Sequence, residues 1–339
     1  MGKVITNPKN YTGKELEQIF FRPLVSGPDA LDLGIRLMYN MPVPTTLNFW
    51  KRAEDVLKKY AKGWEGGGIA DKYQKTIALS KVKAEMGYAA EEYFGMIYEQ
   101  ITNDPKVNLD DLSGTQLEAA ETALFRASIA ESIRATMWLG DTTRESGFNT
   151  FDGFFKRLYA DIGSTENDIQ RIGTDLDMTQ ADAAEDAFAA MLREAPEALR
   201  AMKSQGRLVF LVTRDVYENY EDTLLSSPNL ESVRTEKING NTVMKFRGIP
   251  VKDIGIDAYD LKTTYQLPES CAILTDSRNL ALAVNTNDYP GAEVRMWYNP
   301  DEMENRQRAI FMAGCDYLLP ELIAVAHSAK PTQTDDDSE

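Results

Sequence analysis

The residue types that most often carry enzyme chemistry are scarce in this chain and form no recognisable pattern. The single histidine, His327, excludes a His-pair metal site and an HExxH helix, and any Ser-His-Asp arrangement would have to use it. The two cysteines, Cys271 and Cys315, do not form a CxxC pair and cannot build a disulfide framework. We interpret them as reduced thiols, and His327 as an incidental histidine.

Carboxylates and glycines offer weaker possibilities, and each has a simpler explanation. Asp175 and Asp177 lack the glycine and terminal glutamate that an EF-hand loop needs. The glycine triplet at 66–68 is not followed by the Lys-Ser/Thr of a Walker loop, which favours a flexible loop tip. Three further carboxylates fit a solvated surface better than an acid–base pair: Glu85, Glu91 and Glu92.

One short motif invites comparison with a kinase catalytic loop. Arg214 and Asp215 are followed by Asn219, which is one residue too close, and the Gly-rich loop, strand lysine and Asp-Phe-Gly partner are absent. We predict instead that Asp215 caps a helix after a buried strand. The sequence therefore predicts no catalytic, cofactor-binding or metal-binding residue, and we expect a protein that is not an enzyme.

The composition is that of a folded chain with an excess of negative charge. The chain has 339 residues, a net charge of −16, 43% hydrophobic residues and 9% aromatic residues. It contains no run of about 18 apolar residues, and the N-terminal sequence lacks the apolar core of a signal peptide, so we expect neither membrane insertion nor export. The acidic balance argues against a sequence-reading nucleic-acid binder, but not against a container that encloses DNA.

The charges are unevenly distributed along the chain. Residues 51–83 contain nine basic and four acidic residues, whereas residues 161–200 contain ten acidic and three basic ones. Patches of opposite sign can attract copies of the same chain. Two unrelated solvated faces would explain the same pattern equally well.

The strongest helical signal lies in the middle of the chain. Thr115 and Glu118 form a capping box, and apolar residues continue at helical spacing for roughly 25 residues to Gly140, where a C-cap is expected. A second helix is predicted over 179–202, kinked or divided at Pro196. Strands are predicted at Lys75–Lys83, Arg207–Thr213, Thr242–Phe246, Ile249–Ile254, Cys271–Thr275, Leu280–Val284, Glu293–Tyr298 and Gln307–Asp316.

The order of these elements, together with four segments, resembles a known family. The segments GRLVFLVTRDVYENY, TVMKFRGIPVKDI, CAILTDSRNLALAV and EVRMWYNPDEMENRQRAIFMAGCDYLLPELIAVA resemble the C-terminal half of tailed-bacteriophage major capsid proteins. These proteins adopt the Hong Kong ninety-seven-like fold, which encapsulins share. The resemblance covers about residues 50–328, and its most specific part is 247–251 followed by 275–280.

The resemblance implies an α+β Hong Kong ninety-seven-like capsid fold with a spine helix at 114–140. The implied parts are an N-terminal arm (1–47), an extended loop (48–84), a peripheral domain with the spine helix (85–149), an axial domain (150–290), return strands of the peripheral domain (291–328) and a mobile acidic tail (329–339). It further implies a structural protein of the virion, assembled in the bacterial host cytoplasm. Such a chain self-assembles as pentamers and hexamers into an icosahedral shell around double-stranded DNA, without reading its sequence. The implied partners are portal and scaffolding or decoration proteins, with no cofactor.

The extended loop supplies the candidate inter-subunit contacts: Lys62, Trp64, Lys72, Tyr73 and Lys75. Some family members crosslink a loop lysine to an asparagine of another subunit, but no motif carries that chemistry to this chain, and we expect no crosslink. Two alternatives remain open. One is an encapsulin-like compartment loaded with enzyme cargo, and the other is a soluble enzyme with a site in residues 150–290.

Overall fold

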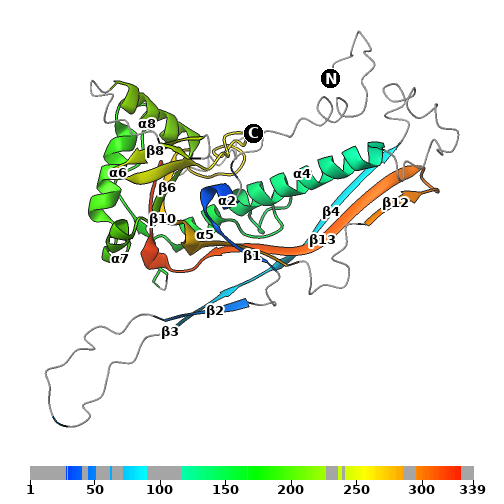
Figure 1. Cartoon of the computed structure of the whole chain (residues 1–339), viewed down its shortest axis with the longest axis horizontal. Coiled ribbons are helices and arrows are strands. Elements are labelled where there is room, and N and C mark those ends of the chain that lie inside the picture. Colours follow the sequence, from blue (N-terminus) through cyan, green and yellow to red (C-terminus); the bar gives the residue numbers. More distant parts are fainter. Residues whose placement is uncertain are drawn as a thin grey trace, which may run out of the picture.

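The computed structural model has a rounded body at one end and a long, narrow sheet leading away from it (Figure 1). It describes residues 28, 30–39, 45–50, 62, 72–89, 116–165, 167–226, 236–238, 241–285 and 295–329. The helices there are α2 (Ala30–Leu33), α4 (Gln116–Leu139), α5 (Phe154–Asp161), α6 (Ala183–Glu194), α7 (Glu197–Ala201) and α8 (Arg214–Ser226), with 3-10 turns η2 (Met202–Gln205), η4 (Ser277–Asn279) and η5 (Pro320–Leu322). The strands are β1 (Arg36–Tyr39), β2 (Thr45–Trp50), β3 (Lys72–Ile77), β4 (Ser80–Ala89), β5 (Gln170–Arg171), β6 (Leu208–Val212), β7 (Glu236–Ile238), β8 (Asn241–Phe246), β9 (Ile249–Asp253), β10 (Cys271–Asp276), β11 (Leu280–Asn285), β12 (Arg295–Asn299), β13 (Glu304–Tyr317) and β14 (Ile323–His327).

The long sheet is built around β13, a strand of 14 residues. Its strand order is β1-β11-β13-β12, and β4 also pairs with β13. Strand β4 runs antiparallel to β13 from the Ala313↔Ser80 pair to the Glu304↔Ala89 pair. Buried and half-buried side chains alternate along most of β13, as expected for a strand with one covered face.

Helix α4 runs beside this long sheet (Figure 1). Its 24 residues correspond to a length of about 36 Å, and its bounds confirm the helix predicted over 114–140. The C-terminal turn is buried, and the Trp138 ring lies 5.3 Å from the Phe154 ring. Gly140 follows, where an added Cβ would lie 2.2 Å from the carbonyl oxygen of Phe151. The helix therefore ends where only glycine permits the chain to approach.

The seven-stranded sheet of the rounded body is a central layer between two hydrophobic cores. Its strand order is β5-β14-β10-β6-β9-β8-β7. In β6, Val209 and Leu211 face the core shared with α4 and α5, whereas Phe210 and Val212 face the core under α6 and α8. All five residues of β6 are buried, which confirms the strand predicted from its continuous apolar run.

Two helix predictions have different outcomes. The helix predicted over 179–202 is divided at Pro196 into α6 and α7, as expected, although α6 begins only at Ala183. The prediction that Asp215 caps the next helix is wrong, because α8 begins at Arg214. The Asp215 carboxylate instead accepts a hydrogen bond from the Ser270 hydroxyl.

The strand predicted over Lys75–Lys83 is two strands, β3 and β4, interrupted at Ala78 and Leu79. The interruption lies against Gly314 of β13, where an added Cβ would be 2.3 Å from the carbonyl oxygen of Ala78. Strand β4 stays on the long sheet, while β3 pairs with β2 in a separate hairpin. The chain therefore leaves the long sheet at Ala78 and Leu79.

Each of the two large sheets contains strands from more than one part of the implied domain map, and the map itself stays a prediction. Residues 30–39 fall in the expected arm, yet Leu33 and Ile35 are buried in the main core and β1 pairs parallel with β11. Strand β11 belongs to the long sheet, and β14 pairs antiparallel with β10 in the rounded body. The rest of the expected arm up to residue 27, most of the loop tip and the tail from residue 330 lie outside the described residues.

Candidate functional site

The hairpin of β2 and β3 projects away from both sheets (Figure 1). Its strands pair from Thr45↔Ile77 near the body to Trp50↔Lys72 at the outer end. Among the predicted contact residues, Lys72 and Tyr73 lie at this outer end, Lys62 is exposed, and Trp64 lies outside the described residues. The geometry places Lys72 and Tyr73 away from the body, and the contact of all these residues with another subunit stays a prediction.

The fifth candidate, Lys75, is held by the body of its own chain. Its Nζ atom lies 3.6 Å from the Asp316 carboxylate and 4.4 Å from the centre of the Tyr317 ring. Arg157 of α5 approaches the same carboxylate at 3.2 Å. The Tyr317 hydroxyl donates a hydrogen bond to the carboxylate of Asp161. Charged groups from β3, α5 and β13 therefore join the inner end of the hairpin to the long sheet.

The electrostatics of this cluster are dominated by burial. The Asp316 side chain is only 5% exposed, and this burial raises the pKa of its carboxyl even though Arg157 and Lys75 act to lower it. Burial and the hydrogen bond to Asp161 also raise the pKa of the Tyr317 hydroxyl. The ion pairs of this cluster hold the inner end of the hairpin against the long sheet, and the burial of the Asp316 carboxylate costs part of the free energy that they contribute.

Several large apolar side chains are exposed on the described surface, and sequence reasoning did not single them out. Leu31 is 66% exposed and Tyr39 65% exposed, beside the edge strand β1. Trp297 on β12 and Met303 in the turn after it are 38% and 56% exposed. Apolar residues scattered along a protein surface are common, so we treat these four only as positions that a neighbour could cover.

Asn219, which the kinase comparison brought to attention, has a structural role. Its side-chain oxygen accepts a 3.0 Å hydrogen bond from the Ala184 amide at the start of α6. Its side-chain nitrogen donates to the carbonyl oxygens of Met178 and Gln180, at 3.2 and 2.8 Å. Because Asp182 at the N-cap position makes no side-chain cap hydrogen bond, Asn219 supplies from α8 the cap that α6 lacks.

The described residues contain neither a cluster that could hold a metal ion nor a helix that could cross a membrane. No group of three or more His, Cys, Asp or Glu side chains is arranged there to hold a metal ion. Within the same residues, no helix has both the length and the apolar character needed to cross a membrane.

Comparison with solved structures identifies the fold. The chain of the capsid of Myoviridae Phage XM1 matches with a TM-score of 0.53 and 13% identity, covering 97% of this chain and 100% of that one. The capsid of the empty GTA particle gives 0.53 and 13%, covering 91% and 92%. The holo-SrpI encapsulin complex from Synechococcus elongatus PCC 7942 gives 0.50 and 11%, covering 92% and 91%.

No protein-family model matches the sequence, and no curated protein matches it. The structural matches nevertheless extend over most of the chain and of its counterparts. The chain therefore has the mixed α+β Hong Kong ninety-seven-like fold of capsid proteins, as the sequence resemblance predicts.

Proposed function

We propose that this chain is the major capsid protein of a tailed phage and self-assembles into an icosahedral shell that encloses double-stranded DNA. The observation that carries the proposal is the fold match, which includes the whole counterpart chain of a phage capsid. The hairpin adds physical support, because a two-stranded projection on its own is marginally stable and gains by packing on a neighbour. Modest contacts repeated around a shell sum to strong assembly.

Within this proposal, the elements take the roles that the resemblance implies. Helix α4 serves as the spine and, with the long sheet, forms the peripheral domain. The body around the seven-stranded sheet forms the axial domain, whose copies meet as pentamers and hexamers. The β2–β3 hairpin is the inner part of the extended loop, and residues 1–47 are the arm, of which β1 pairs with β11 of the same chain. Portal and scaffolding or decoration proteins would complete the particle, without a cofactor.

A second candidate is an encapsulin-like compartment, which the match to the holo-SrpI encapsulin complex supports. Both candidates predict closed particles when the chain is expressed alone and viewed by negative-stain electron microscopy. Nuclease-protected DNA in particles purified from the native source supports the capsid, whereas an enclosed enzyme supports the compartment. A small oligomer at all protein concentrations would contradict both.

A further inference from the structure

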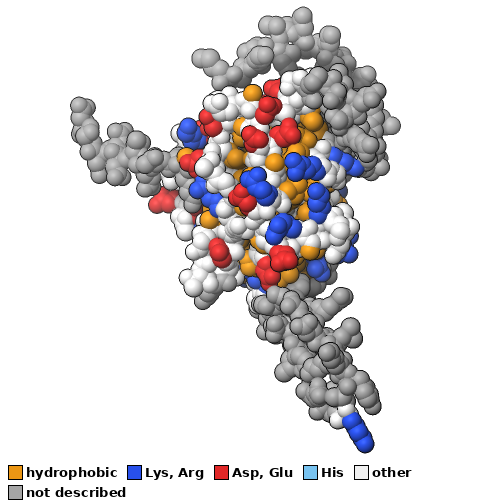
Figure 2. Space-filling model, turned by 90° about the vertical axis from the view of Figure 1, so that its left-hand side faces the viewer, with side chains coloured by type: hydrophobic (Ala, Val, Ile, Leu, Met, Phe, Trp, Pro, Cys, Tyr) orange, Lys and Arg blue, Asp and Glu red, His pale blue; other side chains and the backbone are white. Residues whose placement is uncertain are grey.

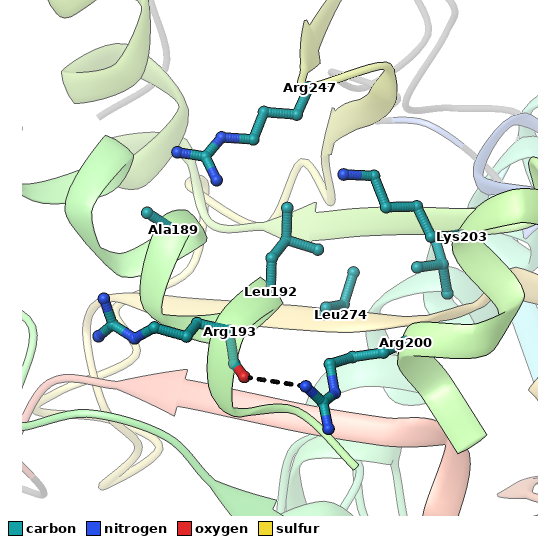
Figure 3. Close-up of a pocket in the computed structure, with 8 residues that line it drawn as sticks. Ala189, Leu192, Arg193, Arg200, Lys203, Arg247 and Leu274 are labelled. Atoms are coloured by element: carbon teal, nitrogen blue, oxygen red, sulfur yellow. Dashed lines mark hydrogen bonds between the residues drawn. The ribbon is translucent and has the colours of Figure 1, made fainter. Parts of the chain in front are cut away.

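The rounded body has a basic cleft at one end of its sheet. This cleft has a volume of about 300 Å³ and an apolar floor that includes Leu192 and Leu274. Four cationic side chains surround the floor (Figure 3): Arg193, Arg200, Lys203 and Arg247. They come from α6, α7, η2 and the β8–β9 turn, all of which meet at the end of the sheet where β6 begins.

Three of these cations have no acidic partner in the described part of the chain. Arg193 pairs with Glu194 at 2.8 Å, but Arg200, Lys203 and Arg247 form no ion pair there. Arg200 donates only a 3.5 Å hydrogen bond to the carbonyl oxygen of Arg193, drawn in Figure 3. The cleft therefore combines apolar surface with cations available to an acidic group from outside the molecule.

The opposite end of the same body is acidic. The segment 175–186 is joined to the far end of β14 by a hydrogen bond from the Leu176 amide to the carbonyl oxygen of His327. Its exposed carboxylates include Asp177, Asp182 and Asp186, and none of the three forms an ion pair with a described cation. Helix α6, about 18 Å long, runs from this acidic end to the basic cleft.

The backbone presents the acidic segment in an unusual way. Asp182 has a φ of 61°, a left-handed conformation that costs energy for a residue other than glycine. Its carboxylate makes no cap hydrogen bond, since Asn219 satisfies the Ala184 amide instead. Asn219 thus fixes the segment while leaving the Asp182 carboxylate free to face another molecule.

We propose that the acidic segment 177–186 of one copy docks on the basic cleft of the next copy, which makes a head-to-tail contact between axial bodies. Two different surfaces meet in such a contact, so it can repeat around a closed ring. On the end of the molecule that carries the body, Lys and Arg side chains gather across the middle of the face, and Asp and Glu side chains lie above, among and below them (Figure 2). The occupant is a second copy because the chain itself carries the complementary acidic surface.

This inference rests on the proposed function, and reversing the charges tests it. The variant Arg200→Glu/Lys203→Glu changes the summed charge of the four cleft side chains from +4 to 0. The variant Asp182→Lys/Asp186→Lys changes the summed charge of segment 177–186 from −4 to 0. We expect each variant to raise the protein concentration needed for particle assembly by about tenfold or more. The chain carrying all four substitutions again has opposite charges at the exchanged positions of the two surfaces, and we expect it to assemble near the wild-type concentration.

Controls separate the contact from changes in net charge and folding. Arg126→Glu/Lys262→Glu changes the net charge by the same amount at exposed positions elsewhere and assembles normally. Asp182→Asn/Asp186→Asn removes the two charges while keeping a residue that tolerates the left-handed conformation, and it weakens assembly less than the lysine variant. Circular dichroism verifies folding of each subunit.

The outcomes distinguish the two proposals. Normal assembly of folded single-end variants, or failure of the four-substitution chain to recover, overturns the contact while leaving the shell intact. If the wild-type chain forms no particles, the proposed function fails. The head-to-tail contact is then tested separately, by measuring the association of the subunits by sedimentation at low salt. Concentration-dependent association that each single-end variant abolishes supports it, and its absence from the wild type overturns it.

Discussion

Removing Lys75 tests whether its ion pair secures the inner end of the hairpin. Two unit charges 3.6 Å apart attract by about 4.6 kcal/mol at an effective dielectric constant of about 20. Desolvation offsets most of this, and Lys75 is itself 25% exposed, so we expect Lys75→Met to lower the free energy of unfolding by about 1–2 kcal/mol at pH 7. Lys83→Met is the matched control, because its pair with Glu85 is exposed and its loss costs less than about 0.5 kcal/mol.

Asp316→Asn should change the free energy of unfolding less than Lys75→Met does. A carboxyl whose folded-state pKa is raised binds its proton more tightly when folded, so its ionised form disfavours the folded state. Asparagine removes that charge and keeps an oxygen for the Tyr317 amide, which donates a 2.9 Å hydrogen bond to Asp316. We expect a change within about 1 kcal/mol at pH 7, and Lys75→Met should cost less in the asparagine background than in the wild type.

The pH dependence follows from the same raised pKa. The stability contributed by Asp316 is complete below its unfolded-state pKa of about 3.9 and is lost as the pH rises through the folded-state value. The stability of Asp316→Asn relative to the wild type therefore increases with pH above about 4. Urea unfolding of the unassembled subunit, followed by tryptophan fluorescence, to which the buried Trp138 contributes, measures the wild type, the two single variants and the double variant. Equal losses for Lys75→Met in both backgrounds would refute the reasoning.

Three further predictions concern the loop, the helix cap and the sheet. Deleting residues 63–70 should leave the subunit folded, as circular dichroism would show, but impair particle formation in electron micrographs; normal particles would contradict the loop's assigned role. Asn219→Ala removes three hydrogen bonds and should lower the free energy of urea unfolding by about 2–3 kcal/mol, whereas an unchanged midpoint would contradict its role as the cap of α6. Gly314→Ala brings a Cβ to within 2.3 Å of the Ala78 carbonyl oxygen and should lower the free energy of unfolding by about 1–3 kcal/mol, which a thermal melt would measure. Gly87→Ala is the control, because its Cβ would be 3.6 Å from its nearest neighbour, and it should melt near the wild type.

Local chemistry made much of the fold predictable. The capping box of Thr115 and Glu118 and the apolar spacing after it indicated α4. The apolar run in 207–213 indicated a strand covered on both faces. Pro196 divided the second helix because its ring and missing amide proton interrupt the hydrogen-bond ladder. Such signals act between residues close in the chain, so one sequence is enough to see them.

Long-range pairing was outside that reach. Nothing local to residues 36–39 indicates that β1 pairs with β11, about 245 residues later in the register Arg36↔Ala281. The pairing of β11 with β13 in the long sheet, and of β14 with β10 in the rounded body, likewise joins strands whose partners no local pattern identifies. The sequence resemblance supplied the fold class, but its domain boundaries could not anticipate these pairings.

The candidate surfaces also depend partly on local sequence and partly on tertiary structure. The sequence by itself determined the length of the main helix and the opposite charges of 51–83 and 161–200, because composition and periodicity are properties of neighbouring residues. The class of fold came from the resemblance of four segments to a known family. Only the tertiary structure decided that Lys75 pairs with Asp316, that Asn219 caps α6, and that a basic cleft lies opposite an acidic segment. Each of these depends on residues brought together by the sheets, and their energy comes from burial and charge in three dimensions.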